Sequence, residues 1–244
     1  MKFEKPIVNG IILNRYKRFL ADVKLSEDFL EHKKGEVIVV HTANTGSMKT
    51  CWEPNWPCAI SFHDNPKRKL KFSLEMTHNK NTWIGINTSL PNKIAVEAIE
   101  DGTIKELQGY QGIKPEIKIG KSRIDILLYD GDDHKNTTRR CYVEVKNATM
   151  LGENGAVIFP DSVSERGQKH LRELIEIVES GDRACMLYIV QREDVDHFSP
   201  AKDIDTEYAR LLNEAVSKGV EALAYICTVN PDGVKVTKPI EVRL

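Results

Sequence analysis

Two neighbouring segments carry charged residues at a spacing that could support catalysis. In Ser-Arg-Ile-Asp-Ile-Leu-Leu, residues 122–128, Asp125 stands among aliphatic residues that favour a strand, whereas aspartate itself disfavours one. A buried, unpaired carboxylate is costly, so Asp125 needs a cation, a set of hydrogen-bond donors or a metal ion. Because successive side chains of a strand point to opposite faces, we expect Ile124 and Ile126 on one face and Asp125 on the other.

The second segment supplies partners for Asp125. In the strand-like stretch 141–146, Glu144 and Lys146 fall on the same face. If the two segments form a hairpin, two carboxylates and one ammonium converge. Mg²⁺ takes oxygen ligands and keeps several waters, and a metal ion beside a phosphodiester polarises it and lowers the pKa of a bound water. A lysine offsets the negative charge of the transition state. The pattern predicts phosphodiester hydrolysis with Mg²⁺ or Mn²⁺.

Each part of this pattern also has a simpler interpretation. An E-x-K step is common on strands with a solvated face, and Asp125 could pair with Arg123 or Arg139. The combination of an aspartate, a hairpin-length gap, E-x-K and a following capped helix favours the catalytic interpretation.

Composition limits the kind of protein that can position these residues. The chain has 244 residues, of which 41% are hydrophobic, which supports a packed core rather than disorder. No run of 18 apolar residues is present, so we expect no membrane-spanning helix, and the first residues do not resemble a secretory signal. Five cysteines without a C-x-x-C pair predict reduced thiols in a cytoplasmic protein.

The hydrophobic pattern divides the chain near residue 80. Short apolar stretches separated by turn signals in 1–82 predict a small β-barrel or sandwich. Alternating helical and strand patterns in 83–244 predict a mixed sheet flanked by helices. We expect Ser89 to cap a helix to about Ile99, a Ser162–Glu165 capping box to open a second helix, and a third over 205–218. The strands of this part are expected at 83–87, 113–119, 124–129, 141–147, 185–190, 223–229 and 234–242.

Positive charge is concentrated in the first part of the chain. Residues 1–82 hold 14 Lys and Arg against 9 Asp and Glu, whereas the remainder holds 21 against 27. Cations for phosphates and rings for bases are what a groove for single-stranded nucleic acid requires. Alternatively, Tyr16 and Phe19 belong to the core and the cations only solubilise the domain. The candidates are Arg15, Tyr16, Lys17 and Arg18, then Lys67, Arg68 and Lys69, with Trp52, Phe62 and Phe72 near them in sequence.

These motifs resemble those of a known family. The D…E-x-K hairpin is similar to the catalytic core of the PD-(D/E)XK nuclease superfamily. The whole chain resembles the sugar fermentation stimulation protein A family, although Thr42-Ala43 replaces the Cys-Pro that commonly precedes Asn44. The matching segments are 15–23, Asn44-Thr45-Gly46-x-Met48, 64–69, 122–125, 144–146, Phe159-Pro160-Asp161, 166–174 and 198–201. The resemblance implies an OB-like domain over 1–82, a nuclease-like domain over 83–244, DNA binding and a role in regulating sugar catabolism, notably of maltose.

The resemblance also implies roles for individual residues. Asp125 and Glu144 match the metal-binding acids, and Lys146 matches the catalytic lysine. Glu97 matches an extra acid that many superfamily members use, although a solvated helix face beside Glu100 is an equally good interpretation.

A basic helix follows the hairpin. Gln168 matches a helix glutamine that related nucleases place near the site. Ordinary helix surface is the alternative, and His170 in particular reads as a surface histidine. The positive charge of Arg166, Lys169, His170 and Arg172 beside the acids favours the site, and Arg166 and Lys169 are the expected contacts with nucleic acid.

Three functions remain open at this point. The first is a metal-dependent nuclease, and the second is a DNA-binding regulator of sugar (maltose) catabolism that does not cleave. The third is a protein whose acids bind a metal or small ligand and whose basic part contacts another protein. The intact D…E-x-K set favours the first over the third. DNA is the expected partner, with single-stranded DNA and RNA left open.

Overall fold

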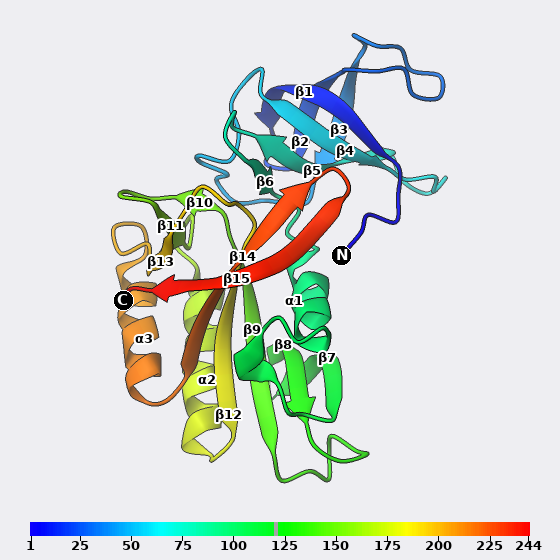
Figure 1. Ribbon diagram of the computed structural model, residues 1–244. Coiled ribbons are helices and arrows are strands. Elements are labelled where there is room, and N and C mark those ends of the chain that lie inside the picture. The colour runs from blue at the N-terminus through cyan, green and yellow to red at the C-terminus, as the bar shows by residue number, and fades with distance from the viewer. Residues whose placement is uncertain (120–121) are drawn as a thin grey trace.

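The computed structural model describes residues 1–119 and 122–244 and begins with a small barrel (Figure 1). Its sheet has the order β3-β2-β1-β4-β5-β6, and a parallel pairing of β3 with β5 closes the first five strands. Alternate residues such as Val8, Val23 and Val40 fill the interior, as the period of two along a strand requires. The strands are β1 (Ile7–Tyr16), β2 (Leu20–Leu25), β3 (Val37–Thr42), β4 (Pro57–Phe62), β5 (Phe72–His78) and β6 (Trp83–Gly85).

The second domain is a mixed sheet between helices. Its strands have the order β10-β11-β13-β15-β14-β12-β9-β8-β7. They comprise β7 (Gly112–Ile119), β8 (Ser122–Tyr129), β9 (Arg140–Ala148), β10 (Met150–Leu151), β11 (Ala156–Phe159), β12 (Arg183–Val190), β13 (His197–Pro200), β14 (Glu221–Asn230) and β15 (Gly233–Val242).

Helices cover both faces of this sheet (Figure 1). Helix α1 (Pro91–Glu100) packs on one face, whereas α2 (Glu165–Glu179) and α3 (Thr206–Ser217) pack on the other. In β12, Leu187 and Ile189 face α1, and Met186 and Tyr188 face α2 and α3. Such a strand is buried on both sides, which explains its continuous apolar sequence.

A buried arginine joins the two domains. Arg192 is fully buried and holds the carboxylate of Asp194 through two hydrogen bonds of 2.6 and 2.8 Å. Its third nitrogen donates to the carbonyl of Thr149 at 2.7 Å and to that of Thr50, in the barrel, at 3.4 Å. The barrel is therefore fixed against the end of β9 (Figure 1).

The expected fold class is confirmed, with differences at the element ends. Trp83–Gly85, expected in the second domain, pairs with β5 in the barrel sheet. Ser89 does not cap α1, which begins after Leu90; its hydroxyl instead donates to Asn87. Ser164, not Ser162, caps α2 by accepting from the N–H of Gly167. The helix expected over 205–218 is α3, which Asp205 caps by accepting from the N–H of Tyr208.

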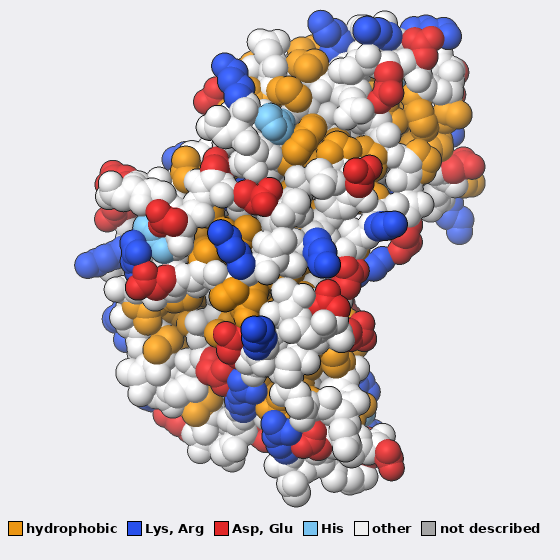
Figure 2. Space-filling model, in the orientation of Figure 1, with side chains coloured by type: hydrophobic (Ala, Val, Ile, Leu, Met, Phe, Trp, Pro, Cys, Tyr) orange, Lys and Arg blue, Asp and Glu red, His pale blue; other side chains and the backbone are white. Residues whose placement is uncertain are grey.

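On the face of the molecule that Figure 2 shows, charged side chains of both signs are present. In the view of Figure 2, acidic and basic side chains alternate over the second domain, and Lys and Arg side chains gather at the end of the barrel farthest from it.

In the described parts of the chain, no helix combines the length and apolarity needed to cross a membrane.

Candidate active site

Glu144 lies at the centre of a buried ionic cluster on β9. Its side chain is almost fully buried, and its Oε1 accepts a hydrogen bond from Nζ of Lys146 at 2.5 Å. The same oxygen contacts Nδ1 of His170 from α2, and that nitrogen lies 3.2 Å from the lysine Nζ. Glu144 and Lys146 face α2 because they alternate with the apolar residues that face α1. The shared face that the sequence predicted for these two side chains is therefore present.

Asp125 lies beside this cluster, at the end of the β8–β9 ladder. The last ladder pair before it is Ile126–Val143. Beyond that pair, the N–H of Val145 donates to Asp125 Oδ2 at 2.8 Å, and Nδ2 of Asn92 in the first turn of α1 donates to Oδ1 at 2.8 Å. Asp125 thus holds the hairpin together where backbone pairing ends.

The expected alternation along β8 is wrong at this position. Ile126 packs in the cluster that faces α1, but Ile124 packs in the cluster that faces α2 and α3. The change of face falls where the backbone pairing of β8 with β9 has ended and the carboxylate of Asp125 accepts the N–H of Val145 instead. Neither Arg123 nor Arg139 neutralises Asp125, because they pair with Glu116 and Asp130 respectively.

Opposite shifts in pKa distinguish the two acids. Burial, and then the charge of Glu144, raise the pKa of Asp125. Burial also favours the neutral form of Glu144, but the hydrogen bond from His170 and the charge of Lys146 outweigh it and lower the pKa of Glu144. Two neighbouring carboxylates with separated pKa values are typical of functional sites.

The cluster has the donor chemistry of a hard divalent cation. Oε2 of Glu144 is buried and has no hydrogen-bond partner among the described residues, and an unpaired buried carboxylate oxygen is costly. Among the described residues, no three or more His, Cys, Asp and Glu side chains are arranged so that they could hold a metal ion together. An ion at Asp125 and Glu144 would therefore keep several waters, as Mg²⁺ usually does. The residues present fit such an ion.

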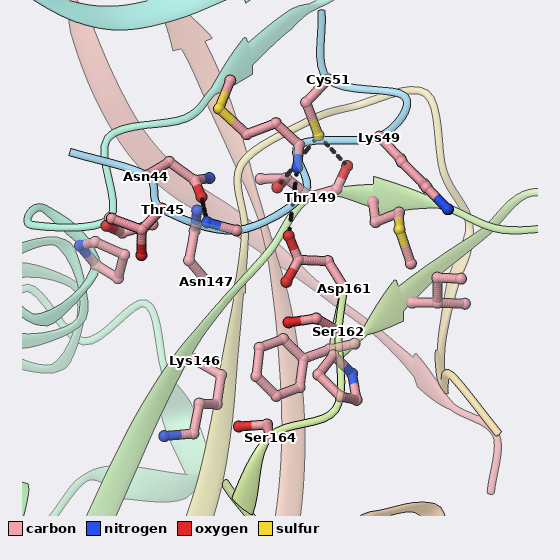
Figure 3. A pocket seen from close by; sticks show the side chains of 18 of the residues that line it. Asn44, Thr45, Lys49, Cys51, Lys146, Asn147, Thr149, Asp161, Ser162 and Ser164 are labelled. Atoms are coloured by element: carbon pink, nitrogen blue, oxygen red, sulfur yellow. Dashed lines mark hydrogen bonds between the residues drawn. The ribbon is translucent and has the colours of Figure 1, made fainter. Parts of the chain in front are cut away.

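The cluster opens on a cleft of about 410 Å³ between the two domains. Lys146 and Asn92, each bonded to one of the two acids, line its floor. In Figure 3 the Lys146 side chain projects toward Ser164, and Asp161 and Lys49 lie farther up the walls. The acids are thus reached from the cleft through Lys146 and Asn92.

Two residues that the sequence placed at the site make other contacts. Glu97 forms an ion pair with the α-amino group of Met1. It lies five residues after Asn92 on α1, which turns it about 140° away. Gln168 donates to the buried carboxylate of Asp205, the cap of α3, at 2.9 Å. The expectation that Glu97 is a metal ligand is corrected accordingly, because its carboxylate pairs with Met1; the place of Gln168 near the acids stays a prediction.

The basic residues at the β1–β2 turn of the barrel differ in their contacts: Arg15 makes structural hydrogen bonds, whereas Lys17 and Arg18 are exposed. Arg15 donates to the carbonyls of Arg18, Asn44 and Gly46 at 2.6–3.0 Å. Its guanidinium therefore stabilises the conformation of this loop, and we assign it a structural role and not phosphate binding. The hydroxyl of Tyr16 donates to Asp22 at 3.0 Å. Lys17 and Arg18 are exposed at the β1–β2 turn.

The remaining basic candidates are mostly on the surface. Lys67 and Lys69 are exposed between β4 and β5, whereas Arg68 is half-buried and donates to Ser73. Arg166 is exposed in the first turn of α2, and Lys169 donates to Ser122 at 2.7 Å. Their contact with nucleic acid stays a prediction. Two of the rings expected to stack on bases, those of Phe62 and Phe72, instead pack against each other and Phe29.

His170 is the residue that sequence reasoning missed. The expectation of a surface histidine is wrong, because His170 is only 3% exposed and contacts both Glu144 and Lys146. The helical period offered a signal, since His170 lies one and four residues before the buried Leu171 and Leu174 and thus near the inward face of α2.

A barrel followed by a sheet that holds an acid–acid–lysine cluster defines a class of protein with an OB domain and a restriction endonuclease-like domain. The model of the family described as "Sugar fermentation stimulation protein RE domain" matches residues 89–233, and that of the "SfsA N-terminal OB domain" matches residues 13–86. The chain belongs to the sugar fermentation stimulation protein family.

Relatives and a solved structure match over the full length. A sugar fermentation stimulation protein homolog of Geotalea uraniireducens is 46% identical, with 100% of both chains covered. A homolog of Geobacter sulfurreducens is also 46% identical, over 99% of this chain and 98% of the relative. The structure of Pyrococcus furiosus SfsA in complex with Ca²⁺ has a TM-score of 0.83 at 28% identity and covers 100% of both chains.

Proposed function

We propose that this protein is a nuclease that hydrolyses phosphodiester bonds of DNA with Mg²⁺ or Mn²⁺. The observation that carries the proposal is the set of Asp125, Glu144 and Lys146, in which the buried Oε2 of Glu144 has no partner among the described residues. The matched restriction endonuclease-like family and the Ca²⁺ complex of the Pyrococcus furiosus protein support it.

Each residue of the set has a task that follows from its contacts. Asp125 and Glu144 would hold the ion, which when bound polarises the phosphoryl group and lowers the pKa of a coordinated water. Lys146 lies at the cleft floor, where its ammonium offsets the charge that develops on the phosphoryl oxygens. Asn92 and the N–H of Val145 orient the Asp125 carboxylate. His170 fixes the carboxylate of Glu144 from the side of α2.

The test is cleavage of labelled oligonucleotides with Mg²⁺ or Mn²⁺, over a panel of single-stranded, duplex and structured substrates. Wild-type protein should cleave at least one substrate, and Lys146→Ala should abolish cleavage while binding is kept. Lys202→Ala is the matched control, because Lys202 is exposed and lies outside the cleft lining. A folded wild-type protein that binds DNA but cleaves nothing in the panel would favour the non-cleaving regulator of sugar catabolism instead.

A further inference from the structure

We infer that the cleft between the barrel and the nuclease-like domain takes a single nucleic-acid strand, and that a loop of the barrel forms one wall of the site. This inference rests on the proposed function, because it names the substrate class of the same site. It makes the barrel a part of the substrate site rather than a separate binding module.

The two walls of the cleft come from different domains. One wall is the loop 44–51 of the barrel, and the other is the segment 158–164 that leads from β11 to α2. Asp161 joins them, since its Oδ2 accepts from Ser47 Oγ at 3.3 Å and from the N–H of Met48 at 3.4 Å (Figure 3). A β-carbon at Gly46 would lie only 2.2 Å from the same carboxylate. The walls are therefore in direct contact beside Asp161.

Positive charge in the cleft remains available to a polyanion. Arg18 and Lys49 line it, and neither side-chain cation makes a hydrogen bond or ion pair within residues 1–119 and 122–244. The negative charge of Asp161, by contrast, lies in the field of the Arg15 guanidinium, which also holds the loop carbonyls of Asn44 and Gly46. Cations on the barrel side and Lys146 on the floor suit a phosphate chain that passes between them.

The size of the cleft favours one strand over two. Its volume of about 410 Å³ is near the low end of the range of about 300–1,000 Å³ that holds a single small ligand. That space suits a nucleotide or two, but a duplex has a major groove that alone measures about 12 Å across. A paired helix does not fit inside a cleft of this volume whose walls are in contact at Asp161. A single strand can follow the cleft floor.

Polar groups along the floor complete the site. Thr45 on the barrel loop and Asn147 on β9 line the cleft near Lys146 (Figure 3). The amide of Asn147 is fixed because its oxygen accepts a hydrogen bond from Gln191 at 2.7 Å. Groups of this kind bind sugar and phosphate oxygens without reading the sequence. We therefore expect little base preference at this site.

The test measures binding alone, in EDTA, so that cleavage plays no part. A fluorescein-labelled strand of about 16 nucleotides, the upper site size of an OB fold, is compared by anisotropy with its duplex at several salt concentrations. Wild-type protein should bind the single strand more tightly. The double variant Arg18→Gln/Lys49→Gln should bind it more weakly, with a log K against log salt slope that is smaller by about 1.4, or 0.7 per lost phosphate contact.

Lys34→Gln is the control, since Lys34 is an exposed lysine of the barrel that does not line the cleft. Its slope should equal that of wild type. Tighter binding of the duplex, or an unchanged slope in the double variant, would overturn the inference even if the protein proves to be a nuclease. A reduced slope in a protein that cleaves nothing would keep the inference and refute the proposed activity.

Discussion

Replacing His170 tests whether the buried cluster is held from α2. In His170→Leu the carboxylate of Glu144 keeps Lys146 but loses its contact with the imidazole. A hydrogen bond to a charged group contributes about 1.5–3 kcal/mol. Since His170 is 3% exposed, water cannot replace the lost donor. For a chain of this length, 1 kcal/mol corresponds to about 2–4 °C in Tm, so we expect Tm to fall by about 3–12 °C.

The assay is thermal unfolding followed by circular dichroism in metal-free buffer. Glu176→Leu is the matched control, because it places the same side chain on the exposed face of the same helix, and Tm should change little there. His170→Gln keeps a donor and should recover part of the loss. If the leucine variant melts within about 1 °C of wild type, Glu144 does not depend on His170 and the reasoning fails.

Two further predictions concern the rest of the molecule. Burial and the charges of Arg68 and Lys5 lower the pKa of His63 to about 4 from an ordinary 6.5. The unfolded chain therefore binds a proton that the folded chain rejects between these values, and stability from this source is lost as pH falls from 6.5 to 4. His63→Gln should flatten the fall of Tm over that range, and an identical pH profile would contradict the assignment. Arg192→Met leaves the half-buried carboxylate of Asp194 with only its hydrogen bond from Asn79 and should lower the free energy of unfolding in urea by about 1–3 kcal/mol; a loss below about 1 kcal/mol would show that the arginine does not brace the domains.

The sequence alone determined the three helices and most of the longer strands, because alternation and turn residues act over a few residues, whereas the short strands β10, β11 and β13 were not predicted. The continuous apolar run of β12, the apolar period of two in β9 and the apolar stripe of α3 follow from local rules. The same alternation put Glu144 and Lys146 on one face, as the structure shows. The sequence also identified Asp125 as a carboxylate in need of a partner, and Asn92 and Val145 meet that need.

The tertiary structure decided which residues join the cluster. Glu97 and Gln168 had suitable chemistry, but the rotation of α1 and the packing of α2 on α3 directed them to Met1 and Asp205. His170 reached Glu144 because α2 crosses β9 at that point. Such contacts join residues far apart in the chain, so their geometry depends on how whole elements pack. No local pattern encodes that packing, and the cleft between the domains arises from it alone.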